Sequence, residues 1–153
     1  MNPMSAALTT EIARRLELAI SAGKEAGRLT LQYFQQDNFQ VERKSDASPV
    51  TIADRSAERL LRDRIAAAFP PDGGLGEELG TTTGSSGFNW ILDPIDGTKS
   101  FISGVPLYGT MIGIEHEHRA LAGVVYMPGL EEGVFASAGQ GAWHFRDDDQ
   151  PRR

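Results

Sequence analysis

Hydrophobic residues recur at helical spacing along the first part of the chain, from Thr9 to about Gln35. This periodicity predicts a long helix capped by Thr9 or Thr10, with Glu11 near the positive end of the helix dipole. The face that this helix buries is formed by Ile12, Leu16, Ala19, Ile20, Ala26, Leu31 and Phe34.

A second stretch with the same periodicity runs from Thr51 to about Phe69, where Pro70-Pro71 ends it. Inside the first helix, Gly23 and Gly27 lie four residues apart, which favours close packing of another element over a role in ligand binding. The predicted buried stripe of the second helix is Ile52, Ala57, Leu60, Leu61, Ile65 and Ala68.

Alternating segments then predict strands. A short strand at 39–43 and a polar turn at 44–49 separate the two helices, and another short strand at 72–75 precedes a mobile surface loop at 79–87. Five further strands are predicted at 88–92, 110–115, 121–127, 133–137 and 141–145, with turns at 117–119 and 128–132 and a polar tail at 146–153. Two helices followed by hairpin-linked strands indicate an α+β fold, in which two long N-terminal helices pack on a mostly antiparallel sheet.

Composition narrows the function. A chain of 153 residues, 40% hydrophobic and 24% charged, suffices for one compact domain. The absence of cysteine excludes a disulfide framework, a zinc ribbon and a thiol nucleophile. A net charge of −6 argues against a nucleic-acid partner but allows a phosphate substrate if a metal brings positive charge. No apolar run is long enough to cross a bilayer, and Met1–Arg15 lacks the apolar part of a secretory signal, so we expect no membrane partner and a cytoplasmic location.

Candidate chemistry is concentrated in the string WILDPIDGT, where an apolar strand runs directly into Asp93 and Asp96. Carboxylates three residues apart would face opposite sides of a continuing strand, so we expect Pro94 to break the strand and turn both toward one point. If a helical turn follows Gly97, the amides of Gly97 and Thr98 point to the same place, where a phosphate group fits.

Carboxylates and a phosphate group repel each other unless a cation lies between them. Oxygen ligands without cysteine or clustered histidine favour Mg²⁺ over zinc. Glu77 and Glu78, at the end of a predicted strand, are natural further ligands, and Asp54 near the start of the second helix is the other candidate.

Each of these acids also has an ordinary structural explanation. Asp54 can form a capping box with Thr51, Glu77-Glu78 can be a solvated turn, and Asp93 and Asp96 can form an Asx-type turn. Lys44 and Lys99 are equally compatible with a place near a phosphate and with a solvated position, and turn, edge or packing roles are favoured for His116, His118, His144, Tyr108 and Trp143.

Three segments together resemble the N-terminal signatures of the inositol monophosphatase superfamily, whose members are Mg²⁺-dependent, lithium-sensitive phosphomonoesterases. These segments are Asp46–Asp54 (DASPVTIAD), Gly76–Glu78 (GEE) and Trp90–Phe101 (WILDPIDGTKSF). The string DPIDGT is specific, and three signatures in the right order make a chance match improbable. The continuations at 102–104 (ISG) and 107–110 (LYGT) are more similar to the histidinol-phosphate phosphatase branch than to the inositol branch.

The resemblance implies a role for each matched residue. The implied ligands of the two or three Mg²⁺ ions of a complete site are Glu77, Asp93, Asp96 and the backbone carbonyl of Ile95. The implied catalytic residues are Asp54 and Thr98, which activate the attacking water, and Glu78, which supports a metal-bound water. The implied phosphate-binding residues are Gly97, Thr98 and Asp96. The implied mechanism is in-line attack of a metal-activated water without a phosphoenzyme.

The resemblance covers the N-terminal α+β portion of a layered sugar-phosphatase fold, here residues 1–153. In the family, the C-terminal α/β portion supplies a Trp-Asp motif whose aspartate completes the metal site. This motif does not follow the hairpin at 141–143, so we expect a fragment, a truncated product or an altered variant. Such a chain would expose a sheet edge and apolar helix faces and would tend to associate.

The leading hypothesis for function is hydrolysis of L-histidinol phosphate, a step of histidine biosynthesis, by a cytoplasmic homodimer. Inositol 1-phosphate, a nucleotide 3′-phosphate and a non-catalytic metal-binding or dimerising fragment are the alternatives. The aspartyl-phosphate hydrolases are excluded, because their D-x-D-G-T signature is one residue shorter than the D-x-x-D-G-T found here.

Overall fold

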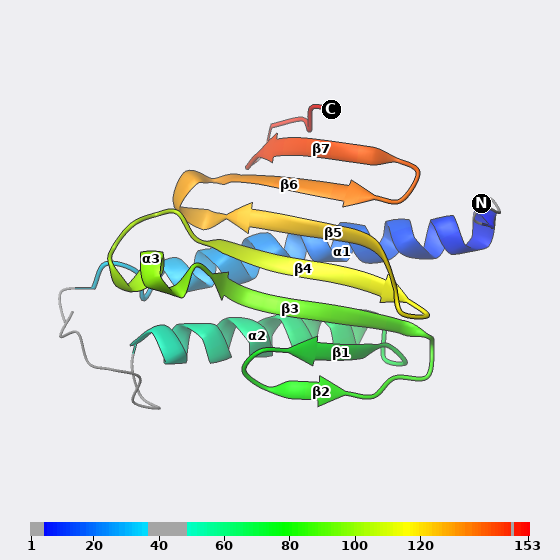
Figure 1. The fold of residues 1–153 in the computed structure, drawn as a ribbon, viewed down its shortest axis with the longest axis horizontal. Helices are drawn as coiled ribbons and strands as arrows, with labels where there is room; N and C mark the ends of the chain where they lie inside the picture. Colours follow the sequence, from blue (N-terminus) through cyan, green and yellow to red (C-terminus); the bar gives the residue numbers. More distant parts are fainter. Residues whose placement is uncertain (1–4, 37–48, 148) are drawn as a thin grey trace.

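The computed structural model describes residues 5–36, 49–147 and 149–153. The chain forms two layers, with the helices α1 (Ala6–Leu31) and α2 (Pro49–Ala68) on one face of a single sheet (Figure 1). The α+β fold predicted from the sequence is therefore confirmed. The predicted strand at 39–43 and most of the predicted turn at 44–49 lie outside the described residues.

The sheet has seven strands in the order β2-β1-β3-β4-β5-β6-β7. All neighbouring pairs are antiparallel except β1 and β3, so the predicted meander is confirmed from β3 onward. The predicted loop at 79–87 contains the short exposed strand β2. The strands are β1 (Gly73–Gly76), β2 (Gly80–Thr82), β3 (Phe88–Asp96), β4 (Gly109–His116), β5 (Arg119–Met127), β6 (Glu132–Ser137) and β7 (Gly141–Arg146), with a short helix α3 (Thr98–Ile102) between β3 and β4 and a 3₁₀ turn η1 (Pro128–Leu130) after β5.

Helix α1 begins earlier than its hydrophobic pattern indicates. Ser5 caps it by accepting the backbone N–H of Leu8 at 3.2 Å, so the predicted caps Thr9 and Thr10 were wrong. Both threonine hydroxyls instead donate to backbone carbonyls one turn earlier, those of Ser5 and Ala6. Glu11, which was expected to act on the helix dipole, forms ion pairs with Arg14 and Arg15.

The buried stripe of α2 differs from the prediction at both ends. Ile52 is 44% exposed, and Ala68 is also exposed. The inner face instead includes two acidic residues, Asp54 and Glu58, which are 7% and 0% exposed. Because acids are seldom buried, a hydrophobic pattern cannot locate a face that contains them. The apolar residues of this face are Ala53, Ala57, Leu61 and Ile65.

Two apolar clusters hold the layers together. The larger one fills the space between the helices and the sheet and includes Trp90, Ile114 and Tyr126. The smaller one consists of Ala53, Ile95, Phe101 and Tyr108, with partly buried side chains from the end of α1 around it. The smaller cluster therefore joins the start of α2 to the end of β3, which are two of the three segments that carry candidate site residues.

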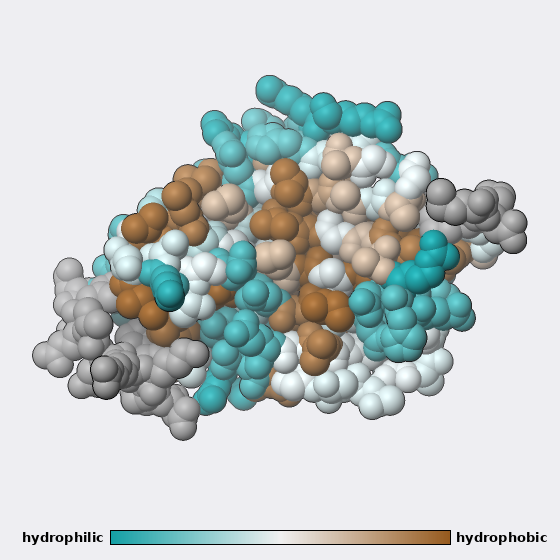
Figure 2. All heavy atoms as spheres, viewed as in Figure 1, coloured by the Kyte–Doolittle hydropathy of each residue, from teal (hydrophilic) through white to brown (hydrophobic). Residues whose placement is uncertain are grey.

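The sheet face opposite the helices is partly apolar, as the brown residues in the middle of Figure 2 show. Leu75, Met111 and Val134 are 48%, 36% and 48% exposed. Apolar side chains are thus exposed on the open sheet face of strands β1, β4 and β6, which is a different surface from the sheet edge and helix faces predicted from the sequence. Among the described residues, no helix has the length and apolarity that a membrane span requires.

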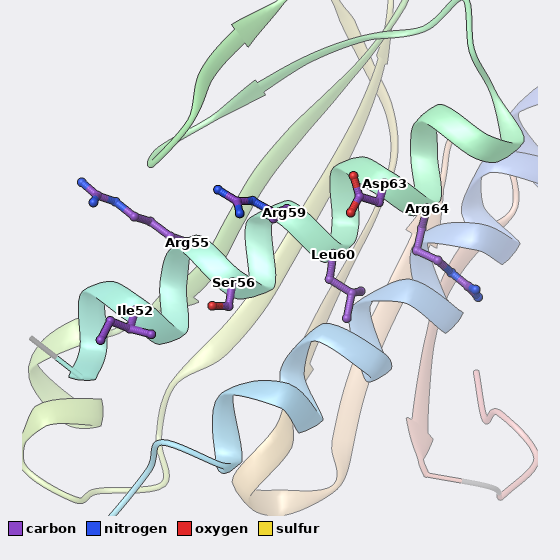
Figure 3. A pocket seen from close by; sticks show the side chains of 7 residues that line it. All are labelled: Ile52, Arg55, Ser56, Arg59, Leu60, Asp63 and Arg64. Carbon is purple, nitrogen blue, oxygen red and sulfur yellow. The ribbon is translucent and has the colours of Figure 1, made fainter. Parts of the chain in front are cut away.

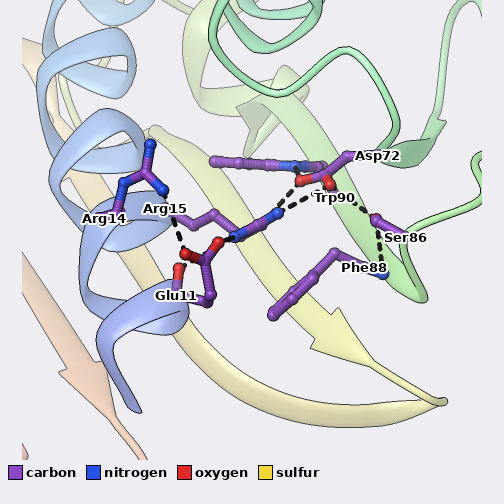
Figure 4. A network of polar contacts seen from close by, with 7 residues as sticks. All are labelled: Glu11, Arg14, Arg15, Asp72, Ser86, Phe88 and Trp90. Atoms are coloured by element: carbon purple, nitrogen blue, oxygen red, sulfur yellow. Dashed lines mark hydrogen bonds and ion pairs between the residues drawn. The ribbon is translucent and has the colours of Figure 1, made fainter. Parts of the chain in front are cut away.

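A buried polar network ties α1 to the segment just before β1 (Figure 4). The Arg15 guanidinium donates to both carboxylate oxygens of Asp72 at 2.8 and 2.9 Å. The same carboxylate accepts the indole N–H of Trp90 and the hydroxyl of Ser86, at 2.9 and 2.7 Å. Since every oxygen of this buried acid is satisfied, the network fixes where β1 enters the sheet.

Candidate metal and phosphate site

Strand register brings two of the predicted metal ligands to one edge of the sheet. Strands β1 and β3 run parallel, and Gly76, the last residue of β1, is paired with Leu92. Glu77 follows directly after the end of β1, and Asp93 is the next residue of β3. Because the two strands run in the same direction, these two acids occupy neighbouring positions.

Strand β3 continues through Pro94, and the prediction that this proline ends the strand was wrong. The pairing with β4 shifts register between Asp93 and Asp96, which is a β-bulge. The carbonyl of buried Pro94 accepts the hydroxyl of Thr110 at 2.8 Å. A break in the strand was expected to turn Asp93 and Asp96 toward one point. The bulge has the same effect, because it interrupts the alternation that would make the two side chains face opposite sides of the sheet.

Asp54 reaches the same region from the first turns of α2. Its neighbour Ala53 packs in the cluster with Ile95 and Tyr108, so the start of the helix packs against the end of β3. Helix α2 begins at Pro49, which places Thr51 inside the helix, and the capping-box explanation for Asp54 therefore does not apply.

The pKa values show that these acids share one region. Burial is the largest cause that raises the pKa of Asp54 to about 7, and the negative charges of Glu78, Asp93, Glu77 and Glu58 contribute to the same rise in that order. Burial likewise raises the pKa of Asp93 to about 6, with contributions from the charges of Glu77 and Asp96. Carboxylates from α2, from the end of β1 and from β3 therefore repel one another across a short gap.

Hydrogen bonding does not relieve this repulsion. Within the described part of the chain, one oxygen of Asp54 and one oxygen of Asp93 (Oδ1 in each) are buried without a hydrogen-bond partner. A backbone hydrogen bond from Ile95, two residues on, lowers the pKa of Asp93 somewhat but does not outweigh burial. Two unpartnered carboxylate oxygens in a cluster of acids suit a hard divalent cation.

Among the described residues, the ligand set is nevertheless incomplete. In residues 5–36, 49–147 and 149–153, no group of three histidine or carboxylate side chains has the arrangement of a finished metal site. Glu77 and Asp96 are exposed, and Glu78 is half-buried and paired with Arg55 at 3.5 Å. The donors fit Mg²⁺ by their chemistry, whereas their arrangement is that of an open, partly built site.

The turn after β3 has the form that the sequence predicts. Gly97 has φ 92°, a left-handed conformation that favours glycine, and α3 starts at Thr98. An added Cβ at Gly97 would lie 3.2 Å from the carbonyl oxygen of Leu107, so this glycine permits close approach of the chain's own backbone. The Thr98 hydroxyl donates to the carbonyl of Ile95 at 3.3 Å, which brings together a predicted catalytic hydroxyl and a predicted ligand carbonyl.

The outer side of α2 carries a separate hollow of about 540 Å³, lined by Ile52, Arg55, Ser56, Arg59, Leu60, Asp63 and Arg64 (Figure 3). Its walls are mainly exposed side chains, and Arg55 is the lining residue that pairs with a candidate site acid, Glu78. The hollow does not contain the unpartnered oxygens of Asp54 and Asp93, so we do not assign the chemistry to it.

Several residues behave as the ordinary explanations predict. Tyr108 is buried and contacts the rings of Phe34 and Phe101, and His116 packs on Phe88 with ring centroids 4.4 Å apart. His118 lies in the turn between β4 and β5. Glu58 was not predicted from the sequence, although its position one turn after Asp54 on the same helix face was an available signal.

Comparison with known proteins gives one consistent result. The model of the inositol monophosphatase family matches residues 11–152. The chain is 50% identical over 128 residues to a histidinol-phosphatase of Chlorobaculum parvum, a match that covers 84% of this chain and 49% of that protein. It is 36% identical over 130 residues to an inositol-1-monophosphatase of Mesorhizobium japonicum, covering 84% of this chain and 49% of that protein.

Solved structures agree in fold. The extragenic suppressor protein SuhB of Bartonella henselae matches with a TM-score of 0.77 at 33% identity, over 92% of this chain and 54% of that chain. SuhB of Mycobacterium tuberculosis matches with a TM-score of 0.75 at 34% identity, over 92% of this chain and 50% of that chain. The chain thus spans about half the length of the curated relatives that it matches.

Proposed function

The chain belongs to the inositol monophosphatase family, and on that premise we propose that it forms the N-terminal half of a metal-dependent phosphomonoesterase site. The proposed substrate is a small phosphate ester, with L-histidinol phosphate favoured over inositol 1-phosphate and a nucleotide 3′-phosphate. The histidinol-phosphatase of Chlorobaculum parvum, at 50% identity, supports this preference.

One observation carries the proposal. Acids from three separate segments meet at one edge of the sheet, and two of their buried oxygens lack a hydrogen-bond partner in the described part of the chain. A folded protein tolerates such unrelieved repulsion poorly, so the arrangement is better explained by a bound cation than by stability. Glu77, Asp93, Asp96 and the Ile95 carbonyl are the groups that would hold Mg²⁺, which would supply positive charge to the phosphate and acidify a water molecule.

The chain's own residues would then bind the ester and move the proton. Asp54, with a pKa near 7, is suited to take a proton from the attacking water, and Thr98 lies at the start of α3 to orient that water. The backbone amides of Gly97 and Thr98 would donate to phosphate oxygens. Glu78, held by Arg55, would orient a further water from behind the ligands. A cytoplasmic homodimer is part of the same proposal.

The test is phosphate release by the 153-residue chain with L-histidinol phosphate and inositol 1-phosphate offered in parallel, each with Mg²⁺ and with chelator. Release that requires Mg²⁺ supports the proposal, and the preferred ester identifies the branch of the family. A folded chain that releases no phosphate from either ester contradicts catalysis of these reactions by this chain alone and favours the second candidate function below.

A second candidate function is a non-catalytic module that binds metal without turnover. The incomplete ligand set among the described residues favours it. Calorimetric titration with Mg²⁺ separates the two, because such a module gives a binding isotherm without any phosphate release.

A further inference from the structure

The second acid on the inner face of α2, Glu58, has no role in the site as described so far. Glu58 is fully buried, one helical turn after Asp54. Its side chain points to the turn that joins β1 to β2, which is the turn that carries Glu77 and Glu78. A buried carboxylate needs compensating partners, and those of Glu58 show what it does.

Two of these partners are consecutive backbone amides of the turn. The Glu58 carboxylate accepts the N–H of Glu78 at 2.8 Å and the N–H of Leu79 at 3.2 and 3.3 Å to its two oxygens. The N–H of Glu78 belongs to the peptide group that follows the Cα of Glu77. Fixing this peptide plane also fixes the direction in which the Glu77 side chain leaves the backbone.

The third hydrogen-bond partner of Glu58, Arg62, also connects α2 to the next strand, β2. The Nε of Arg62 donates to the Glu58 carboxylate at 2.8 Å. The same guanidinium donates to the Thr82 hydroxyl at 2.8 Å and to the carbonyl of Gly80. Glu58 and Arg62 together therefore fasten α2 to both ends of the turn.

The sequence makes room for this contact. A Cβ built on Gly76 would lie 1.9 Å from Oε1 of Glu58 and 2.3 Å from its Cδ. Any side chain at position 76 would push the carboxylate away from the amides. The glycine that opens the Gly76-Glu77-Glu78 segment is thus required by Glu58 and not by an unusual backbone angle.

We propose that Glu58 is a positioning residue, which holds the Glu77-Glu78 turn in the orientation that presents Glu77 to the cation beside Asp93. The inference rests on the proposed function, because it assigns Glu58 a role in building the same metal site. Helix α2 would then have two roles in the site. Asp54 is one of the site residues, and Glu58 holds the turn that carries Glu77.

The test measures binding of Mn²⁺ alone, as a spectroscopic substitute for Mg²⁺, by electron paramagnetic resonance. Glu58→Gln keeps the size of the side chain but replaces one acceptor oxygen by an amide donor. We expect it to weaken Mn²⁺ binding by roughly ten- to a hundred-fold, as loss of a residue that orients a ligand does. Glu58→Asp, which keeps the charge, should restore part of the affinity.

Asp72→Asn is the matched control, because it makes the same carboxylate-to-amide change at another buried acid that accepts from an arginine. Asp72 lies before β1, whereas Glu77 follows the end of that strand. We expect Asp72→Asn to lower thermal stability and to leave Mn²⁺ affinity within about twofold of the unsubstituted chain.

A second variant disturbs the contact between Glu58 and the turn by a change at Gly76. Gly76→Ala displaces the Glu58 carboxylate while leaving it in the protein, and should lower Mn²⁺ affinity as Glu58→Gln does. Amide hydrogen exchange of the metal-free chains gives a readout without metal, since Glu78 and Leu79 should lose protection in both variants and keep it in Asp72→Asn.

Four results overturn the inference: unchanged Mn²⁺ affinity in a folded Glu58→Gln or Gly76→Ala chain, an equal loss in Asp72→Asn, unchanged exchange at Glu78 and Leu79, or no Mn²⁺ binding by the unsubstituted chain. Intact Mn²⁺ binding without release of phosphate contradicts only the proposed catalytic function.

Discussion

Asp54 and Asp93 each bury one carboxylate oxygen that has no hydrogen-bond partner in the described part of the chain. The two acids come from a helix and from a strand, and they approach each other because Ala53 and Ile95 pack in one apolar cluster. The packing of Ala53 against Ile95 thus offsets the repulsion between the two neighbouring carboxylates. This arrangement has a measurable consequence for stability.

The metal-free chain should lose stability as the pH rises from about 4 to about 7. Burial raises the pKa of Asp54 to about 7 and that of Asp93 to about 6, above the ordinary value of 3.8, so the folded state binds more protons than the unfolded state across this interval. Urea denaturation at a series of pH values should show a loss of several kcal/mol. Asp54→Asn should flatten the slope, and an unchanged slope in that variant would contradict the assignment.

Millimolar Mg²⁺ should reverse the same loss near pH 7, because a cation stabilises the ionised form of both acids. The measurement is the denaturation midpoint with Mg²⁺ and with chelator at pH 5 and pH 7.5. A stabilisation that is equal at the two values would show that the ion binds elsewhere.

Asp72 should behave in the opposite way and in a different pH interval. Burial alone would raise its pKa, but hydrogen bonds from Arg15, Ser86 and Trp90 outweigh burial and lower it. Its contribution is therefore present above the ordinary carboxyl range and is lost as the pH falls below about 4.

Removing this acid should be costly at neutral pH. Asp72→Asn leaves the buried Arg15 without its bidentate partner, and we expect a loss of about 3–5 kcal/mol in the free energy of unfolding. The emission of Trp90, which donates to Asp72, should report the same transition. Glu11→Gln, on the exposed end of the network, is the control and should cost less than about 1 kcal/mol.

The sequence predicts the strands well because their alternation and turns are local signals. The five strands from Phe88 onward and the turns between them are found at or within a few residues of the predicted positions. The parallel pairing of β1 with β3 was not predictable in this way, since it depends on where α2 returns the chain. The inner face of α2 was misjudged because Asp54 and Glu58 occupy it.

The candidate site was predictable for a different reason. The string around Asp93 and the acids at 77 and 78 carry a family signature, whereas no periodicity would connect them. The signature does not predict which parts of the structure hold these acids in place. The bulge at Pro94 and the contact of Glu58 with the turn at Glu78 exist only in three dimensions.

The two glycines inside α1 offer a matched pair of substitutions. A Cβ at Gly27 would lie 2.7 Å from a ring carbon of Tyr126, whose hydroxyl donates to Asp147. Gly27→Ala should therefore destabilise the fold by about 1–3 kcal/mol despite the better helix propensity of alanine. At Gly23 the nearest atom is a methyl carbon of Ile112 at 3.4 Å, so Gly23→Ala should be neutral or stabilise by up to about 1 kcal/mol. Thermal melts compare the pair, and equal effects would contradict the packing argument.

Thr98→Ala should slow phosphate release much more than it weakens Mg²⁺ binding. The hydroxyl donates to the Ile95 carbonyl, and the proposed function uses it to orient the attacking water rather than to hold the ion. Turnover and calorimetric affinity are measured on the same preparation. Parallel losses of both would assign Thr98 to the metal site instead.

Asp93→Asn should remove most of the affinity for the ion. The Oδ1 of Asp93 is buried and unpartnered, and the charges of Glu77 and Asp96 contribute to the raised pKa of this carboxyl, so Asp93 interacts with both other proposed carboxylate ligands. We expect the dissociation constant for Mg²⁺ to rise at least tenfold, a difference of about 1.4 kcal/mol. Since the substitution also removes a repelling charge, the metal-free chain should become more stable above pH 6. Asp63→Asn, on the exposed side of α2, is the control and should change neither quantity. Unchanged Mg²⁺ affinity in Asp93→Asn would reject the ligand set. A purely structural role for Asp93 cannot produce a loss of Mg²⁺ affinity together with a gain in the stability of the metal-free chain.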